Sequence, residues 1–216
     1  MFTRQGCREL RQAGEKEPAL HIPIKKCRVE WSTAVGRLSA REATLDDARE
    51  HAAVLSDGYN HPPNAELMGH AAPISRDEVI EIYAGMLSND ARPFLLFCDG
   101  VLVGDGDLRG VADGAAEFAF MIASPTTQGK GLGTRFALMI AAFGFREAGL
   151  RRIYASVVPQ NIASRRVFEK LGYVVDDSES ARAYADEPDD IVLSLDRDVF
   201  ERTNAAMIAE LEIGPR

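Results

Sequence analysis

The stretch Pro125-Thr126-Thr127-Gln128-Gly129-Lys130-Gly131-Leu132-Gly133-Thr134 sets three alternate glycines between an apolar run and an amphipathic segment. The apolar run, Ala116–Ala123, is typical of a buried strand. The segment after the glycines predicts a helix, because apolar residues recur there at helical spacing: Phe136, Met139, Ile140 and Phe143. Glycines let backbone N–H groups turn inward, and the start of a helix adds a positive partial charge. The stretch therefore predicts an anion site suited to a phosphate or pyrophosphate.

Two common nucleotide motifs do not fit this loop. A P-loop needs Ser or Thr directly after its lysine and a glycine five positions before it, whereas Gly131 follows Lys130 and position 125 is Pro. A dinucleotide fingerprint needs GxGxxG near the first strand, whereas the spacing here is GxGxG after several predicted strands. A plain strand–helix turn that uses glycine only for its geometry stays the alternative to an anion site.

The chain before the loop contains clear turn and capping patterns. Asp99-Gly100 and Asp113-Gly114 predict hairpin turns between three strands, at 93–98, 101–108 and 116–123. Thr44 begins one predicted helix, and Ser75 with Glu78 forms a capping box for a second that ends near Leu87. His61-Pro62-Pro63 predicts a loop between these helices. A short strand is predicted at 38–43, and one is possible at 26–31, where a loose arm is the alternative.

After the loop the chain predicts the remaining elements of one fold. They are strands at 152–158, 173–175 and 191–195, a helix from Asn161 to Leu171, and a tail helix at 198–211. The predicted elements alternate strands and helices, and the hairpin turns make the strands before the loop antiparallel neighbours. We divide the chain into an N-terminal extension at 1–37, a central domain at 38–197 and a helical tail at 198–216.

Composition narrows the functional classes. The 216 residues are 46% hydrophobic and include no apolar run long enough for a membrane span, nor the apolar core of a secretory signal. Cys7, Cys27 and Cys98 are widely spaced, which argues against a disulfide scaffold or a metal site and favours the cytoplasm. The net charge of −8 disfavours nucleic-acid binding and suits a cationic substrate, although a solvated acidic surface explains it equally well.

A second segment strengthens the interpretation of the loop. Asn161-Ile162-Ala163-Ser164 leads to Gly172-Tyr173, and with the glycine-rich loop it resembles the GNAT superfamily of acyl-CoA N-acyltransferases. The stretches AEFAF, QGKGLGT and NIASRRVFEKLGY are nearest to the RimJ/RimL-like ribosomal-protein N-acetyltransferase branch. The resemblance covers about residues 38–195. It implies the α/β (α+β) class, with a GNAT-like mixed, mostly antiparallel sheet of about seven strands that is flanked by helices and splays between its fourth and fifth strands. It also implies acetyl-CoA (coenzyme A) as co-substrate, with no metal.

The resemblance also implies which residues hold the cofactor. Backbone groups of Met121, Ile122 and Ala123 in the splay would pair with pantetheine. The loop amides would hold the pyrophosphate, and the second segment would contact the cofactor arm. The residues so implied are Met121, Ile122, Ala123, Gln128, Gly129, Lys130, Gly131, Leu132, Gly133, Thr134, Asn161, Ser164 and Phe168.

The implied reaction is attack of a neutral amine on a thioester. Glu117 is the candidate base because it is the one carboxylate on the central apolar strand, and pairing with a basic residue such as Arg109 is the alternative. Asp105 and Asp107 are further candidates, or else exposed hairpin residues. Many family members have Tyr, a proton donor, where this chain has Phe168. Ser164 is therefore the candidate acid, with helix packing as its alternative role.

Together these patterns predict an acetyl-CoA-dependent N-acetyltransferase that acetylates a primary amine of a small molecule or a protein N-terminus by direct attack. The alternatives are a non-catalytic acyl-CoA-binding sensor and a polyamine or aminoglycoside acetyltransferase. We expect neither nucleic-acid nor membrane partners, and the tail helix is a possible homodimer contact.

Overall fold

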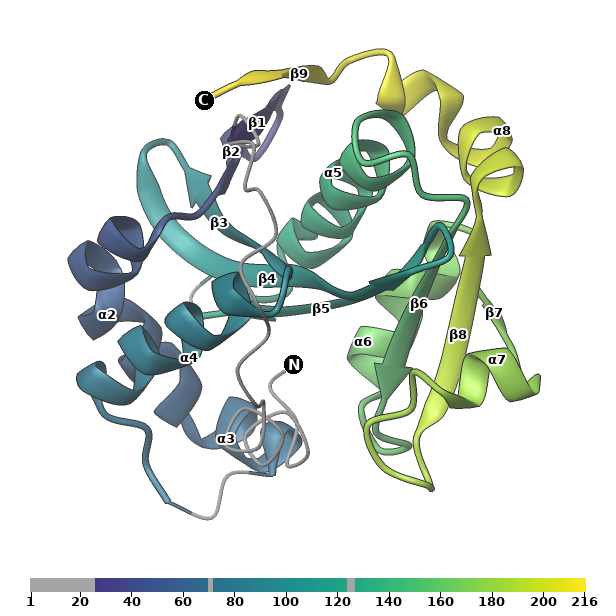
Figure 1. Ribbon diagram of the computed structural model, residues 1–216. Helices are drawn as coiled ribbons and strands as arrows, with labels where there is room; N and C mark the ends of the chain where they lie inside the picture. Colours follow the sequence, from purple (N-terminus) through teal and green to yellow (C-terminus); the bar gives the residue numbers. More distant parts are fainter. Residues whose placement is uncertain (1–25, 70–71, 124–126) are drawn as a thin grey trace.

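The computed structural model describes residues 26–69, 72–123 and 127–216 (Figure 1). Cys7, Pro125 and Thr126 lie outside the described residues. The described strands form a single sheet in the order β7-β8-β6-β5-β4-β3-β2-β1-β9. Their bounds are β1 Cys27–Thr33, β2 Gly36–Glu42, β3 Arg92–Cys98, β4 Val101–Ala112, β5 Ala115–Ile122, β6 Arg152–Val157, β7 Val174–Val175, β8 Ile191–Asp196 and β9 Glu212–Pro215.

The sheet confirms the predicted class and is mixed, with β5 and β6 as the one parallel pair among the described strands. It has nine described strands rather than about seven. One addition is β1, where alternating side chains made a strand possible. The other is β9, which pairs with β1 over only four positions, Cys27↔Pro215 to Glu30↔Glu212. So short a segment, containing Gly214 and Pro215, has no strand pattern of its own and forms by pairing with β1.

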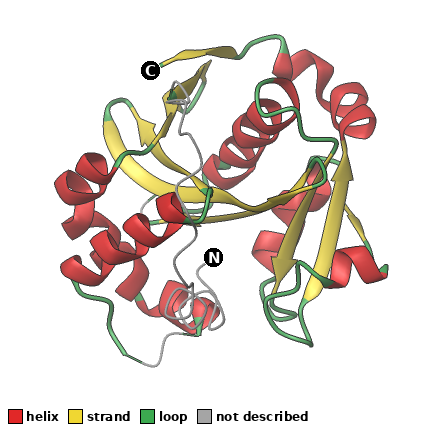
Figure 2. Cartoon of the chain, in the orientation of Figure 1, coloured by secondary structure: helices red, strands yellow, loops and turns green. Residues whose placement is uncertain are grey.

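Helices cover both faces of this sheet (Figure 2). One face carries a core built around Leu55, Tyr59 and Tyr83, from α2 and α4. The other carries a larger core around Phe136 and Phe143 of α5 and Phe200 of α8. The bounds are α2 Leu45–Asn60, α3 Pro62–Met68, α4 Arg76–Ser88, α5 Leu132–Arg146, α6 Ile162–Lys170, α7 Glu179–Arg182 and α8 Arg197–Ile208. None of the helices in the described ranges is long and apolar enough to cross a bilayer.

The loop predicted at His61-Pro62-Pro63 is wrong, because a short helix, α3, begins there. Its prolines occupy the first turn, where backbone N–H groups have no partner within the helix and the fixed proline φ suits helical geometry. The helix ends at Gly69, which is left-handed with φ 64°. The prolines therefore start a new helix after α2 has ended, and α3 stands as a separate wall beside the sheet.

The two ends of the described chain meet at one edge of the sheet. The tail helix predicted at 198–211 ends earlier, at Ile208, and the chain continues into β9. Arg216 then pairs with Asp47, whose carboxylate also completes the capping box of α2 with Thr44. The division at 37 and 197 stays a prediction, and β1 and β9 lie in the same sheet as the strands of the central segment.

Candidate active site

A split in the sheet is the first feature of the candidate site. The parallel strands β5 and β6 pair only from Ala115↔Arg152 to Glu117↔Tyr154. Beyond Glu117 the strands separate, although β5 continues to Ile122 and β6 to Val157. The predicted splay between the fourth and fifth strands of the central segment is therefore confirmed, and it leaves one side of β5 without a partner strand.

The direction of the backbone groups on β5 decides which of them face the split. The carbonyl oxygens of Ala119 and Met121 face Gly106 and Gly104 of β4, where an added Cβ would meet them at 2.6 and 2.4 Å. The Ala123 N–H donates to the Val103 carbonyl at 2.9 Å. Since backbone groups alternate sides along a strand, those of Phe120 and Ile122 face the split. The expectation that Met121 and Ala123 offer backbone groups there is wrong, because the Met121 carbonyl and the Ala123 N–H face β4.

The glycine-rich loop lies beside the split and runs into α5. Gly129 and Gly131 have φ of +76° and +74°, values that residues with a Cβ seldom adopt. Gly131 is the N-cap of α5, and it has no side chain to cover the amides of the first turn. Thr44, Ser75 and Asn161, by contrast, cap their helices through side-chain oxygens. The first-turn amides of α5 thus keep the positive partial charge that the sequence predicted.

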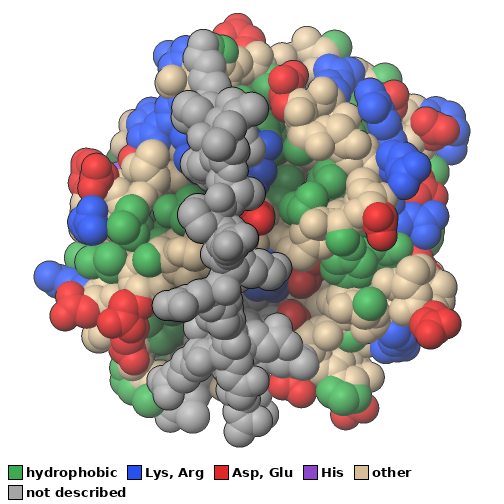
Figure 3. Space-filling view, viewed as in Figure 1, with side chains coloured by type: hydrophobic (Ala, Val, Ile, Leu, Met, Phe, Trp, Pro, Cys, Tyr) green, Lys and Arg blue, Asp and Glu red, His purple; other side chains and the backbone are tan. Residues whose placement is uncertain are grey.

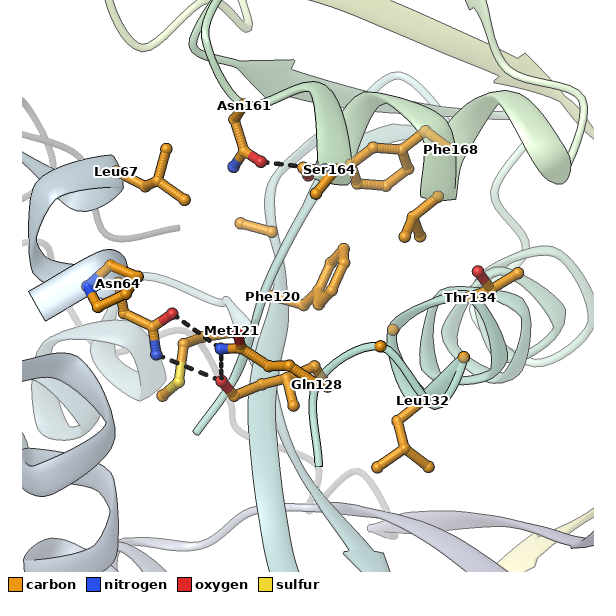
Figure 4. Close-up of a pocket in the computed structure, with 18 of the residues that line it drawn as sticks. Asn64, Leu67, Phe120, Met121, Gln128, Leu132, Thr134, Asn161, Ser164 and Phe168 are labelled. Atoms are coloured by element: carbon orange, nitrogen blue, oxygen red, sulfur yellow. Dashed lines mark hydrogen bonds between the residues drawn. The ribbon is translucent and has the colours of Figure 1, made fainter. Parts of the chain in front are cut away.

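A pocket of about 410 Å³ joins these features (Figure 4). Its walls come from α3, β5, the glycine-rich loop with the start of α5, the end of β6, and α6. Met121, Ala119 and Ser156 line it from the face of the sheet that carries α2 and α4, whereas Phe118 and Phe168 belong to the core of the opposite face. The pocket therefore passes through the sheet at the split.

Most of the predicted cofactor residues line this pocket. They are Met121, Ile122, Gln128, Gly129, Gly131, Leu132, Gly133, Thr134, Asn161, Ser164 and Phe168. The side chain of Lys130 is exposed and Ala123 is buried, and neither is among the lining residues. Sequence reasoning missed Asn64 and Leu67 because it placed a loop where α3 forms. It also missed Ser156, which is polar at the end of an otherwise apolar strand.

The second motif forms α6 as its capping pattern suggests. The Asn161 Oδ1 accepts from the Ser164 N–H at 3.0 Å, so the two residues share one turn at the pocket. Phe168 is 2% exposed, and its ring lies 5.7 Å from that of Phe120 and 4.9 Å from that of Tyr173. Phe168 therefore closes the pocket as part of an aromatic cluster, and the hydroxyl of Ser164 is a polar group on the same wall.

Side-chain amides connect α3 to the glycine-rich loop. The Asn64 Nδ2 donates to the carbonyls of Gly58 at 2.9 Å and Ile122 at 3.2 Å. The Gln128 Nε2 donates to the same Ile122 carbonyl at 3.1 Å and to the Asn64 Oδ1 at 3.2 Å (Figure 4). Four parts of the fold thus meet at one point: the end of α2, α3, the last residue of β5, and the loop.

The carboxylate of Glu117 makes the contacts of an ion pair. Arg109 donates from Nε to one oxygen at 2.9 Å and from an Nη to the other at 3.0 Å. Burial disfavours a charged guanidinium, but the carboxylates of Glu117 and Asp107 outweigh it and raise the pKa of Arg109. These contacts match the alternative role that the sequence left open for Glu117.

Asp105 and Asp107 are buried on the α2–α4 face and are not exposed hairpin residues. The hydroxyls of Tyr59 and Tyr83 both donate to Asp105 Oδ2. Burial raises the pKa of Asp105 to about 6, although the two hydroxyls partly offset the effect. Asp107 Oδ2 lies 3.9 Å from the Nε of Arg109, and burial raises its pKa as well.

The pocket opens on this face beside further carboxylates. The Ser156 hydroxyl donates to Asp190 Oδ2 at 2.9 Å and accepts from the Asp186 N–H at 3.1 Å. Asp186 also lies 3.6 Å from Arg109. Acidic side chains accordingly appear near the centre of the face seen in Figure 3, as well as around its rim. The carboxylate of Asp190 therefore lies behind Ser156 at this end of the pocket, whereas the loop end carries the amides of α5.

Comparison with protein-family models gives a match over residues 37–174 to the acetyltransferase (GNAT) domain. The chain belongs to the GNAT family. Spermidine N(1)-acetyltransferase of Escherichia coli (strain K12) is 36% identical over 87 residues, which are 39% of this chain and 46% of that protein. A probable N-acetyltransferase of Bacillus subtilis (strain 168) is 35% identical over 77 residues, 35% of this chain and 42% of that protein. The matches therefore span less than half the length of these curated GNAT relatives.

Solved structures share the GNAT fold at low sequence identity. Mycobacterium smegmatis RimJ, in complex with CoA-disulfide, has a TM-score of 0.67 at 20% identity, covering 86% of this chain and 96% of that one. The aminoglycoside acetyltransferase AAC(6')-Ib with coenzyme A has a TM-score of 0.64 at 21% identity, covering 77% and 99%. The RimJ-like branch that the sequence resembles is thus among the GNAT proteins with this fold.

Proposed function

We propose that this GNAT protein is an acetyl-CoA-dependent N-acetyltransferase that transfers an acetyl group to a primary amine by direct attack on the thioester. The observation that carries the proposal is the pocket through the split sheet. Helix amides lie at one end, and Ser156, which bonds the Asp190 carboxylate, lies at the other. Such a passage lets a donor and an acceptor enter from opposite faces and meet between β5 and β6.

The residues present suit coenzyme A. The amides from Gly129 to Thr134 would hold the pyrophosphate, because they are close to a helix start that carries no capping side chain. The backbone groups of Phe120 and the N–H of Ile122 face the split, where an extended pantetheine arm can pair with them as a short strand would. The Asn161 and Ser164 side chains lie on the wall opposite.

In the proposed reaction the amine lone pair attacks the carbonyl carbon, the C–N bond forms, the C–S bond breaks, and the thiolate leaves. The nitrogen then gives up its extra proton to solvent, and the thiolate takes up a proton to become the free thiol. The ammonium proton must be lost first or during attack. For an α-amine with a pKa near 8 this costs only about 1 kcal/mol at pH 7, against roughly 4–5 kcal/mol for a lysine amine. An acceptor with an ordinary α-amine pKa therefore needs little help from a base. The hydroxyl of Ser164 is placed to donate to the departing sulfur.

A polycationic acceptor, such as a polyamine or an aminoglycoside, is the second candidate. One specific observation favours it: Asp107, Glu117 and Asp186 lie around the guanidinium of Arg109 on the acceptor face. Asp190 lies beside them, because Ser156 bonds both Asp190 and Asp186. Among the described residues no donor lies within hydrogen-bonding distance of Asp107 Oδ2, which is buried. The matched spermidine N(1)-acetyltransferase acts on such a molecule, as its name states.

A substrate panel tests the proposal. The protein is incubated with acetyl-CoA and a peptide with a free N-terminus, a monoamine, spermidine or an aminoglycoside, while thiol release and the mass of each amine are followed. We expect thiol release together with an acetylated amine. Binding of coenzyme A in a calorimeter without thiol release for any amine would instead identify a non-catalytic sensor. A kcat/KM for spermidine that does not fall with added salt would remove the polycation candidate.

Two further parts of the proposal concern the setting of the enzyme. Cys27 and Cys98 carry free thiols, which supports a cytoplasmic location. A homodimer through the tail stays a prediction, and a sedimentation measurement of the molar mass tests it.

A further inference from the structure

The carbonyl oxygen of Ile122 lies where the split, α3 and the glycine-rich loop meet. It accepts from Asn64 Nδ2 at 3.2 Å and from Gln128 Nε2 at 3.1 Å. A carbonyl oxygen has two lone pairs, so these side-chain amides use its whole acceptor capacity. The carbonyl also ends β5 on the side that faces the split. Its two donors come from the opposite walls of the pocket, α3 and the loop.

Asn64 is the residue that joins these walls. It is 9% exposed, and each half of its amide is used: Nδ2 bonds the Gly58 and Ile122 carbonyls, and Oδ1 accepts from Gln128 at 3.2 Å. The amide orientation is the one in which each atom has a suitable partner. The end of α2 packs closely against Ala123, the residue after β5, because a Cβ at Gly58 would lie 2.8 Å from that of Ala123. Asn64 is therefore held in place through the end of α2, and its side-chain oxygen holds the amide of Gln128.

We propose that Asn64 is a positioning residue that acts through Gln128, holding the start of the cofactor loop in its binding shape and coupling that loop to α3. The inference rests on the proposed function, since it assigns the loop to coenzyme A. In this arrangement the loop loses little conformational entropy when the cofactor binds, because Gln128 is already fixed. The helix α3 forms the pocket wall at the acceptor end, and the Asn64 side chain links it to the loop that would hold the cofactor.

The same geometry explains why α3 carries an asparagine at this point. A hydrophobic residue would pack against Leu67 and Met68 but would leave the amide of Gln128 with only one protein acceptor at this site. A charged carboxylate would accept from Gln128 but would face the carbonyls of Gly58 and Ile122. An amide alone supplies both the donors that these carbonyls need and the acceptor that Gln128 needs.

A double-mutant cycle tests the inference in the full chain. Calorimetry gives the Kd for coenzyme A of the wild type, Asn64→Ala, Gln128→Ala and the double variant. We expect each single substitution to raise the Kd about five-fold, the equivalent of one neutral hydrogen bond. The Kd of the double variant should be no higher than that of the single variant with the higher Kd, because both substitutions break the same hydrogen bond.

Leu67→Ala is the matched control, because Leu67 lines the same pocket from α3 and Figure 4 draws it without a bond to the loop. Its effect should be additive with that of Gln128→Ala. Thermal unfolding of each variant checks that the fold is kept. If Asn64→Ala does not fold, Asn64→Ser replaces it, since a serine is too short to reach Gln128 and is a small polar residue suited to the first turn of a helix.

The outcomes separate the inference from the proposed function. Effects of Asn64→Ala and Gln128→Ala that simply add, or an unchanged Kd in the Asn64 variants, would overturn the positioning role while leaving the acetyltransferase proposal intact. A wild-type protein that binds no coenzyme A at all would overturn both. Non-additive effects for the pair, with additive effects for the Leu67 control, would support the inference.

Discussion

Arg109 donates hydrogen bonds to both carboxylate oxygens of Glu117, at the point where β5 and β6 begin to separate. The distances are 2.9 and 3.0 Å, and Glu117 is the last residue of β5 that pairs with β6, through Tyr154. The ion pair therefore ties β4 to β5 beside the closed end of the split. Its position makes it a structural part of the site, whatever the source of the base.

We expect Glu117→Gln to lower the free energy of unfolding by about 3 kcal/mol, because the largely buried guanidinium of Arg109 would keep a weaker set of partners. Denaturant unfolding measures this loss. The matched control is Glu169→Gln, which removes a half-exposed pair with Arg165 and should change stability by less than about 0.5 kcal/mol. The acidic limb of the kcat/KM pH profile should persist in Glu117→Gln. A stable variant that lacks this limb would identify Glu117 as the base.

Gly129 and Gly149 offer a matched pair for testing the cofactor loop. Both have positive φ, +76° and +69°, and an added Cβ would meet nothing within 4 Å at either. Alanine should therefore cost about 1–2 kcal/mol of stability at each position. Only Gly129 lines the pocket. We expect Gly129→Ala to raise the Kd for coenzyme A about ten-fold and Gly149→Ala to leave it unchanged, as calorimetry would report. Equal Kd values for the two variants would argue against the loop as the pyrophosphate site.

Ser164→Ala should lower kcat more than it changes the Kd for coenzyme A. A hydrogen bond to a departing thiolate strengthens as charge develops, so we expect a fall in kcat of about ten-fold or more. The cap of α6 should survive, because the Asn161 side chain bonds the backbone N–H of residue 164. Steady-state kinetics with a saturating amine measures kcat. An unchanged kcat would leave Ser164 with a packing role only.

Asp105 should give the protein a distinctive dependence of stability on pH. Its pKa is about 6 in the folded state, mainly through burial, against about 3.9 in an unfolded chain. The folded state therefore binds the proton more tightly. The resulting stabilisation is complete below pH 4 and is lost as the pH rises through 6, a loss of about 2–3 kcal/mol. Compared with Asp105→Asn, the wild type should lose this amount between pH 4 and pH 7.

Denaturant unfolding of both proteins across this pH range gives the difference directly, since the other carboxylates titrate in each. Asparagine keeps an acceptor for the hydroxyls of Tyr59 and Tyr83, so the variant should fold. A difference between the two proteins that is flat, or that grows with pH in favour of the wild type, would contradict the raised pKa.

Local patterns made much of the fold predictable from the sequence. The capping boxes at Thr44 and Ser75 and the cap at Asn161 depend on residues only three positions apart, so they could be recognised without knowing the fold. The glycine-rich loop was predictable for the same reason. The helix α3 was not, because two prolines in sequence indicate a break and only the capped geometry distinguishes a break from a new start.

The parts that sequence could not decide depend on register and on distant pairing. Placing Glu117 and Arg109 on neighbouring strands allowed either a base or an ion pair, and only the register Arg109↔Glu117 sets them opposite each other. The strand β9 forms because β1 has an unpaired edge with which it can hydrogen-bond. No local sequence pattern indicates this pairing. Asn64 became visible as a site residue only once α3 was in place.

The three paired positions that join β5 to β6 have a mechanical consequence. The sheet has two parts: one from β5 to the edge strand β9, and one that contains β6, β8 and β7. These parts are joined only at the three paired positions. A ligand bound in the split would contact both parts of the sheet at its open end and reduce their motion relative to each other. Coenzyme A should therefore slow amide hydrogen exchange along β6 as well as β5, including amides that the ligand itself never reaches.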